Sequence, residues 1–297
     1  MPISSAWRHW LEAARPRTLP AAVIPVMVGT ALATAHRAAD YGNAAICLAF
    51  ALLVQVGTNF ANDYFDFVQG ADTPERVGPR RAVAAGLIAP KAMLGATWLV
   101  LGVAFAVGLL LVREGGWVLL PVGLVSIGCA IAYTGGPFPL GYNGLGDLFV
   151  FLFFGLVAVC ATFYVQAGHV APDVVSCAAA IGLLAANILV ANNYRDVETD
   201  TRAGKKTLVV RFGRKFAVWQ YALSHVVALL CPPALLLAGG YRWPVLLPLG
   251  LAPWAAALTR RLAVSREPAE QIVLLGRTAL YLAAFGGLLS AGVVFGR

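Results

Sequence analysis

Two stretches of this sequence, residues 62–81 and 192–211, place carboxylate and amide side chains directly after long apolar runs. Their leading polar residues are Asn62, Asp63 and Asp66 in the first stretch and Asp196 and Asp200 in the second. Acids three or four residues apart share one face of a helix. The whole chain has only 14 Asp and Glu, so this grouping stands out. Carboxylate oxygens combined with substrate phosphates are typical ligands of Mg²⁺, and the two stretches together predict such a site.

Basic side chains follow the acids in both stretches. They are Arg76, Arg80 and Arg81 after the first group of acids, and Lys205, Lys206 and Arg211 after the second. Arg forms forked hydrogen bonds with phosphate and Lys acts as a point charge, whereas neither stretch offers the His or Cys ligands typical of zinc. A solvated, charge-rich loop would explain either stretch alone. The same order of Asn, Asp and base in both favours a site for a metal–diphosphate group.

The composition indicates a membrane protein. The chain is 60% hydrophobic and 12% charged, with a mean hydropathy of +0.77, whereas soluble domains carry about 25% charged residues. In a chain this apolar, charge placement across a bilayer explains the net charge of +8, and no nucleic-acid partner is expected. The five Cys lie in or beside apolar runs without CxxC spacing, which indicates packing residues rather than ligands or disulfides.

Apolar runs long enough to cross a hydrocarbon core recur along the chain. They predict an all-α fold: a polytopic membrane bundle of nine transmembrane helices, forming one domain over residues 1–297. The expected spans are residues 19–36, 43–61, 92–112, 116–134, 148–168, 173–191, 215–237, 243–260 and 271–294. Residues 1–18 lack the apolar core and cleavage site of a signal peptide, and we interpret them as an amphipathic lead-in.

The distribution of Lys and Arg predicts the orientation of the bundle. With the N-terminus inside, the inner segments carry 17 of the 22 Lys and Arg and the outer segments carry four, while Arg277 falls within the last span. By the positive-inside rule this predicts a cytoplasmic N-terminus in a bacterial cytoplasmic membrane. Loops 62–91 and 192–214 would then form an active site that faces the cytoplasm.

The two polar stretches resemble the motifs of the UbiA superfamily of intramembrane aromatic prenyltransferases. That family has N-D-x-x-D-x-x-x-D after its second helix and D-x-x-x-D after its sixth. The matching residues are Asn62, Asp63, Asp66, Asp196 and Asp200. Position 70 is Gly where the family has a third Asp, and Asp72 is the next acid. The longer stretches 14–33, 133–155 and 192–213 are similar to the branch that prenylates 1,4-dihydroxy-2-naphthoate.

This resemblance implies an enzyme that transfers a polyprenyl group from polyprenyl diphosphate to 1,4-dihydroxy-2-naphthoate. CO₂ and diphosphate would be lost and demethylmenaquinol formed, with two Mg²⁺ ions expected and Mn²⁺ as the alternative. The implied metal ligands are Asn62, Asp63, Asp66, Asp72, Asp196 and Asp200, and the diphosphate-binding candidates are Arg80, Arg81, Lys205, Lys206 and Arg211. The acceptor-binding candidates are Arg17, Tyr64, Tyr133, Asn193 and Tyr194.

Four of the implied ligands would be catalytic through the metal: Asp63, Asp66, Asp196 and Asp200. Asp147, at the inner end of the fifth expected span, is a further catalytic candidate that would bind or deprotonate the acceptor, and a helix cap is its alternative role. Because a long prenyl tail cannot leave the lipid, the resemblance also implies a lateral opening of the bundle toward membrane lipid.

Three other functions remain open at this point. The first is the same reaction on another acceptor, such as 4-hydroxybenzoate, homogentisate or haem. The second is a terpene cyclase that uses the same diphosphate site without an aromatic acceptor. The third is a cation transporter, which would need its acids near the middle of the spans. The acids lie instead at span ends beside bases, which suits an anionic ligand.

Overall fold

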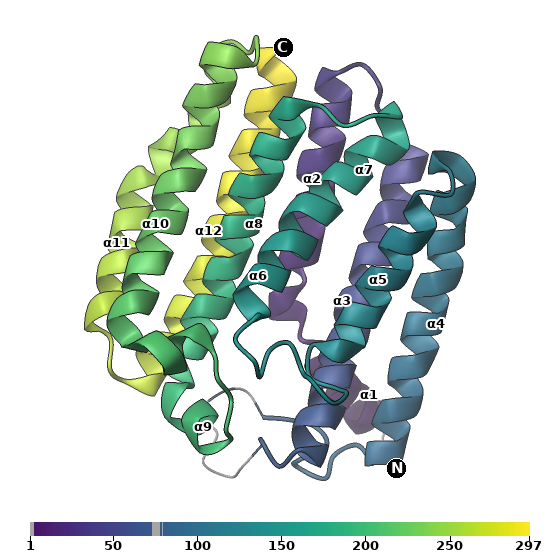
Figure 1. Cartoon of the computed structure of the whole chain (residues 1–297), viewed down its shortest axis with the longest axis vertical. Helices are drawn as coiled ribbons and strands as arrows, with labels where there is room; N and C mark the ends of the chain where they lie inside the picture. The colour runs from purple at the N-terminus through teal and green to yellow at the C-terminus, as the bar shows by residue number, and fades with distance from the viewer. Residues whose placement is uncertain (1–2, 73–77, 79) are drawn as a thin grey trace.

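The computed structural model describes residues 3–72, 78 and 80–297, and within these residues every regular element is a helix. Most of the long helices run side by side along the vertical axis of Figure 1. The elements are α1 (Ile3–Ala14), η1 (Pro16–Thr18), α2 (Pro20–Ala35), α3 (Tyr41–Val68), α4 (Pro90–Gly115), α5 (Leu119–Ala132), α6 (Gly146–Val150), η2 (Phe151–Val157), α7 (Ala158–Ala167), α8 (Pro172–Arg195), α9 (Val197–Arg202), α10 (Leu208–Ala238), η3 (Trp243–Leu251), α11 (Ala252–Val264) and α12 (Pro268–Gly296).

Local sequence explains most of the helix boundaries. Pro90, Pro172 and Pro268 each begin a helix, where the missing N–H has no partner to lose. The Asp40 carboxylate accepts a hydrogen bond from the N–H of Asn43 at 3.0 Å and caps α3. Gly213 interrupts α10 with φ of 80°, a conformation that favours glycine. The helix is kinked at this residue, and its long part follows the kink.

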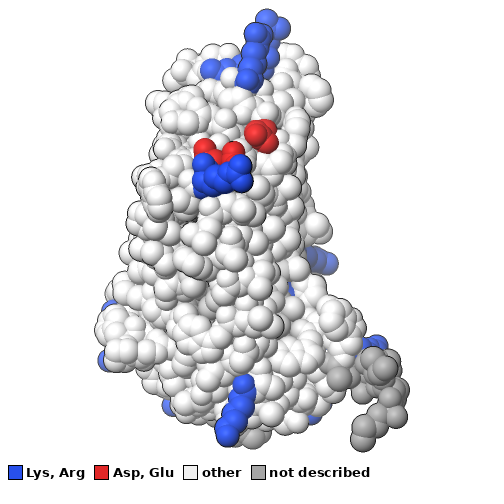
Figure 2. All heavy atoms as spheres, turned by 90° about the vertical axis from the view of Figure 1, so that its right-hand side faces the viewer, with Lys and Arg blue, Asp and Glu red and all other residues white. Residues whose placement is uncertain are grey.

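Among the described residues, six helices are long and apolar enough to cross a membrane, and the bent pair of residues 7–18 and 20–35 adds a seventh if it forms one span. α5 is apolar but shorter, and η3 continues into α11. Each of the nine expected ranges falls on one of these helical segments. Figure 2 shows a broad middle band almost free of charged side chains, with charge toward the two ends of this face.

Helix α8 lies at the centre of the bundle. In its most apolar stretch 67% of the residues are buried, against 22% in α4, which places α4 at the periphery. α8 packs against α10, α12 and η2, and its contact with η2 depends on two glycines. A Cβ on Gly155 would lie 2.6 Å from the Cα of Gly182, so only glycines allow this approach.

Helix α2 contacts helices on both sides of the bundle. α3 packs mainly on α4 and also contacts α2 and α5, whereas η2 and α7 pack on α8 and α2. The C-terminal ends of α3, α5 and α8 all lie at the lower end of Figure 1, near α1 and α9. We call this the site end. The C-terminus lies at the opposite end.

Candidate active site

A cavity of about 390 Å³ runs through the bundle from the site end. Its wall at the site end is polar and includes Asp66, Asp196 and Lys205. Further along, apolar side chains of α3, α4, α5, η2 and α7 line it. The lining extends to Val112 and Val165, near the C-terminal ends of α4 and α7, which point away from the site end. The cavity therefore has a polar mouth and a long apolar interior.

Asp66 is buried at the polar mouth and contacts side chains of several segments. Its side chain is only 2% exposed, and its carboxylate accepts hydrogen bonds from Arg81 Nη2 at 2.7 Å and from the Tyr142 hydroxyl at 2.7 Å. Burial and the adjacent Asp66 carboxylate raise the pKa of Tyr142, so this hydroxyl stays protonated and donates. Three separate segments thus meet at one carboxylate.

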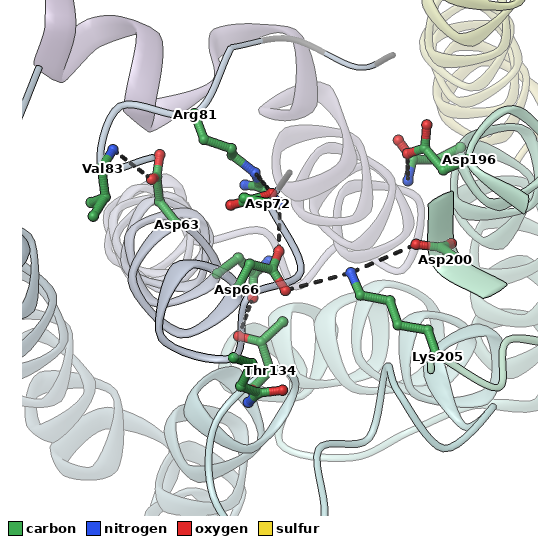
Figure 3. A network of polar contacts seen from close by, with 12 residues as sticks. Asp63, Asp66, Asp72, Arg81, Val83, Thr134, Asp196, Asp200 and Lys205 are labelled. Atoms are coloured by element: carbon green, nitrogen blue, oxygen red, sulfur yellow. Dashed lines mark hydrogen bonds and ion pairs between the residues drawn. The ribbon is translucent and has the colours of Figure 1, made fainter. Parts of the chain in front are cut away.

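Lys205 joins the two acid-rich helix ends. Its Nζ lies 3.5 Å from Asp66 Oδ1 and 3.7 Å from Asp200 Oδ1, and Figure 3 shows the ammonium between the two carboxylates. The same ammonium lies 4.6 Å from the centre of the Tyr142 ring. Stretches far apart in the sequence, after α3 and after α8, therefore converge on one point.

Asp196 lies at the junction of α8 and α9. Arg195 holds its carboxylate through two hydrogen bonds, Nε to Oδ1 at 2.7 Å and Nη2 to Oδ2 at 2.6 Å. A second donation from Arg195 Nη2, at 2.8 Å, reaches Asn192 Oδ1. Asn192, Asp196 and Asp200 all line the cavity, so the two turns around this junction present their oxygens to the same space.

Asp63 and Asp72 are arranged differently from Asp66. Both carboxylate oxygens of Asp63 accept backbone N–H groups, from Ala82 at 3.1 Å and Val83 at 3.0 Å, and Figure 3 shows Asp63 turned toward Val83. Asp63 therefore anchors the returning loop to α3. Asp72 Oδ1 lies 3.5 Å from Arg81 Nε, and so shares the guanidinium that contacts Asp66.

Arg81 offers an unused donor in this cluster. Its side chain is 7% exposed and lines the cavity, yet its Nη1 has no hydrogen-bond partner in the described part of the chain. A buried guanidinium N–H without a partner is costly, and an anionic oxygen in the cavity would satisfy it. This orphaned donor fits a phosphate group at the polar mouth.

The other predicted bases lie outside the cavity lining. Arg80 and Lys206 are exposed, and the Lys206 N–H donates to the Tyr142 carbonyl at 2.7 Å. Arg211 Nη2 donates to the carbonyl of Asn143 at 3.0 Å. Lys206 and Arg211 thus fasten the glycine-rich connection 133–145 to the loop after α9. Arg76 lies outside the described residues.

Among the acceptor candidates, Tyr133 and Asn193 line the cavity. The Tyr133 ring fits beside glycine, because a Cβ on Gly146 would lie 2.9 Å from its hydroxyl oxygen. Asp147 is buried in the first turn of α6, where its Oδ1 accepts a hydrogen bond from Gln220 Nε2 at 3.0 Å.

The remaining acceptor candidates are placed elsewhere. Arg17 is exposed, and Tyr64 packs in the cluster around Ala82 and Val83. The Tyr194 hydroxyl accepts a hydrogen bond from Arg266 at 2.8 Å, away from the cavity. These residues lie near the site in the sequence, but their side chains do not line the cavity.

Arg15, rather than Arg17, contributes a cation to the cavity lining. Arg15 lies at the break between α1 and η1 with φ of 51°, a left-handed conformation that is uncommon for non-glycine residues. Two amides of α3 hold this turn: Gln55 Nε2 donates to Thr18 Oγ1 at 3.1 Å and Asn59 Nδ2 to the Ala14 carbonyl at 2.9 Å. Gln55 and Asn59 are four residues apart on α3, and this spacing in the sequence indicates a polar helix face. Nothing in the local sequence pattern identified Arg15 or Tyr142 as lining the cavity.

The polar mouth suits Mg²⁺ by ligand chemistry. Among the described residues, no three His, Cys, Asp or Glu side chains form a group ready to share a metal ion, because Arg81 and Lys205 stand between the carboxylates. The cavity-lining oxygen donors are nevertheless of the type that Mg²⁺ takes. They belong to Asn62, Asp66, Asn192, Asp196 and Asp200.

The sequence also matches known proteins. The model of the UbiA prenyltransferase family matches residues 22–293. The chain is 38% identical to a 1,4-dihydroxy-2-naphthoate octaprenyltransferase of Mycobacterium tuberculosis, covering 99% of both chains. It is also 33% identical to a protein of the same description from Haemophilus influenzae, covering 99% of this chain and 98% of the relative.

Solved structures share the fold. A UbiA homolog from Archaeoglobus fulgidus bound to GPP and Mg²⁺ aligns with a TM-score of 0.68 at 16% identity, covering 95% of this chain and 99% of that one. The apo structure of a UbiA homolog from Aeropyrum pernix has the same TM-score, covering 88% of this chain and 96% of that one. With the family model spanning nearly the whole sequence, the chain belongs to the UbiA prenyltransferase family.

Proposed function

We propose that this protein transfers a polyprenyl group from polyprenyl diphosphate to 1,4-dihydroxy-2-naphthoate, with loss of CO₂ and diphosphate, in menaquinone synthesis. The relatives at 38% and 33% identity are described as enzymes that act on this acceptor. The observation that carries the proposal is the convergence of Asp66 and Asp200 on Lys205 at the mouth of a long apolar cavity. This combination suits a charged diphosphate head with an apolar tail.

Mg²⁺ held by Asp66, Asp196, Asp200 and the neighbouring amides would supply charge stabilisation for the departing diphosphate. The unpartnered Arg81 Nη1 and the Lys205 ammonium would bind the phosphate oxygens. These preorganised cations are then in place where negative charge develops as the allylic C–O bond breaks. The apolar interior would hold the prenyl chain and exclude water from the allylic cation.

The acceptor is proposed to bind on the α3 side of the polar mouth. Arg15 would pair with its carboxylate, while Thr58 and Asn62 offer polar groups along the same face of α3. Tyr133, which lines the cavity, would orient a ring hydroxyl of the acceptor. Because the product loses CO₂, the Arg15 contact is needed only until the ring carbon has attacked.

We further propose that nine segments cross the membrane, with the N-terminus and the site end on the cytoplasmic side. The excess of Lys and Arg in the connections at the site end supports this orientation. The exposed apolar residues Trp7 and Leu11 of α1 would rest in the membrane interface.

The test is an acceptor comparison. Purified protein receives polyprenyl diphosphate and Mg²⁺ with either 1,4-dihydroxy-2-naphthoate or 4-hydroxybenzoate, and CO₂ and the prenylated product are measured by mass spectrometry. We expect CO₂ and demethylmenaquinol with the naphthoate. Prenylation of 4-hydroxybenzoate without any naphthoate product would overturn the proposed acceptor, and no transfer to the naphthoate would overturn the proposed reaction.

A further inference from the structure

Lys205 occupies the space that the two acid-rich helix ends share. Its ammonium is within 3.7 Å of Asp66 Oδ1 and Asp200 Oδ1, and its side chain is 15% exposed. Asp66 is 2% exposed, so its negative charge needs a nearby cation. In the structure as it stands, Lys205 and Arg81 supply that cation.

A divalent ion and an ammonium cannot both occupy the space between the same carboxylate oxygens, because like charges repel at this distance. We propose, on the basis of the proposed function, that Lys205 is a built-in counter-cation of the metal-free site. Metal binding displaces it from Asp66 and Asp200, and the freed ammonium then contacts a diphosphate oxygen. Lys205 is therefore a positioning residue for the metal as well as a ligand of the diphosphate.

The surroundings of Lys205 allow this movement without loss of the residue from the site. Its own N–H donates to the Asp200 carbonyl at 2.9 Å, which fixes the base of the side chain, while the four-carbon stem can turn. Arg81 lacks this freedom, because its planar guanidinium contacts Asp66 and Asp72 together. Of these two cations, Lys205 is the one that can leave the carboxylates.

The Tyr142 ring keeps the Lys205 ammonium at the polar mouth when it leaves the carboxylates. Its ring already lies 4.6 Å from Lys205 Nζ, an attractive cation–π distance. The ring is held from two sides, since its hydroxyl donates to Asp66 and its carbonyl accepts the Lys206 N–H. Lys205 therefore remains beside an aromatic face at the polar mouth after the carboxylates have turned to the metal.

This arrangement couples the two ligands. Metal alone must displace Lys205 and so binds weakly, whereas metal with diphosphate gives the displaced ammonium a new partner. Coupling of this kind is reciprocal, so each ligand raises the affinity for the other. The site would then retain metal chiefly when diphosphate is present.

The experiment measures metal binding directly, by calorimetric titration of purified protein with Mg²⁺, without and with inorganic diphosphate. The variants are Lys205→Met, Lys205→Arg as the charge-conserving version, and Lys91→Met as the matched control, since Lys91 is an exposed lysine at the start of α4. We expect Lys205→Met to bind Mg²⁺ alone about tenfold more tightly than the native protein, as loss of a charged competitor predicts. Diphosphate should strengthen Mg²⁺ binding less in this variant. Lys91→Met should resemble the native protein, whereas Lys205→Arg, which keeps the competing charge, should not tighten the binding of Mg²⁺ alone.

Equal or weaker Mg²⁺ binding by Lys205→Met, with Lys91→Met normal, would overturn the inference. If Lys205→Met fails to fold, Tyr142→Leu compared with Tyr142→Phe provides the second test. Both variants lack the hydroxyl that donates to Asp66, so they differ only in the ring; Tyr142→Leu should show the smaller gain in Mg²⁺ binding from diphosphate, and an equal gain would contradict the role of the ring. If Lys205→Met binds the metal more tightly but the native protein transfers nothing to the naphthoate, only the proposed function is rejected.

Discussion

Two ionic clusters lie at opposite ends of the bundle, and they differ in what their charges face. At the site end, Asp66 and Asp200 meet Lys205 and Arg81 at the mouth of the cavity. At the other end is a distal cluster, which we define as His36, Asp173, Tyr241 and Arg297. Asp173 Oδ2 accepts from Tyr241 at 2.6 Å and pairs with His36 at 2.7 Å and Arg297 at 3.2 Å.

The distal cluster pairs its charges internally and lies apart from the cavity. One carboxylate is surrounded by three donors from the ends of α2 and α12 and from the α10–η3 connection, and none of the four residues lines the cavity. At the site end, the carboxylates of Asp66, Asp72 and Asp200 contact Arg81 and Lys205, and Arg81 keeps a buried donor without a hydrogen-bond partner among the described residues. Charge alone therefore does not mark the site. An orphaned donor and an adjoining cavity do.

The sharpest test of this contrast is Asp66→Asn, with Asp196→Asn as its counterpart on the other helix end. Each removes a negative charge from the polar mouth, and we expect kcat to fall about 100–1,000-fold. Steady-state assays of purified protein, with circular dichroism to check folding, would measure this. Near-native turnover of either variant would remove that residue from the metal site.

A smaller loss is expected for Asp63→Asn. The Asp63 carboxylate holds the N–H groups of Ala82 and Val83 rather than facing the cavity. Its loss should misplace Arg81 and lower kcat/KM about 10–100-fold, mainly through a higher KM for the diphosphate. Calorimetric Mg²⁺ binding should change little. Loss of Mg²⁺ binding equal to that of Asp66→Asn would instead make Asp63 a direct ligand.

Arg15→Gln and Arg17→Gln distinguish the two candidate acceptor cations. Arg15 lines the cavity and Arg17 is exposed. We expect Arg15→Gln to raise the KM for 1,4-dihydroxy-2-naphthoate about tenfold, as loss of one charge-assisted hydrogen bond predicts, with a smaller rise for Arg17→Gln. KM values measured at saturating polyprenyl diphosphate would settle the order, and the reverse order would move the acceptor carboxylate to Arg17.

Substitution in the distal cluster should have no effect on the chemistry. Asp173→Asn weakens the hydrogen bonds from His36, Tyr241 and Arg297, and should destabilise the fold by about 1–3 kcal/mol while kcat stays at the native value. Thermal unfolding in detergent and the transfer assay would show this. A fall in kcat without a fall in stability would show that the two ends of the bundle are coupled.

Local sequence determined much of this protein. Long apolar runs predicted the membrane helices, because each must satisfy its own backbone in lipid, and prolines such as Pro90 and Pro172 begin them. The spacing of Asp63, Asp66, Asp196 and Asp200 predicted the family. These features depend on neighbours within a few residues, and so they are readable without a fold.

Tertiary structure alone decided which of those side chains face the cavity. Asp63 and Asp66 are one turn apart, yet one holds a backbone loop and the other holds Arg81 and Tyr142. Arg15 replaces Arg17 in the cavity lining because the chain turns through a left-handed residue. Tyr142 reaches Asp66 only because its loop packs against the loop after α9. Helical periodicity carries no information about such contacts, since they depend on segments distant in sequence meeting in space.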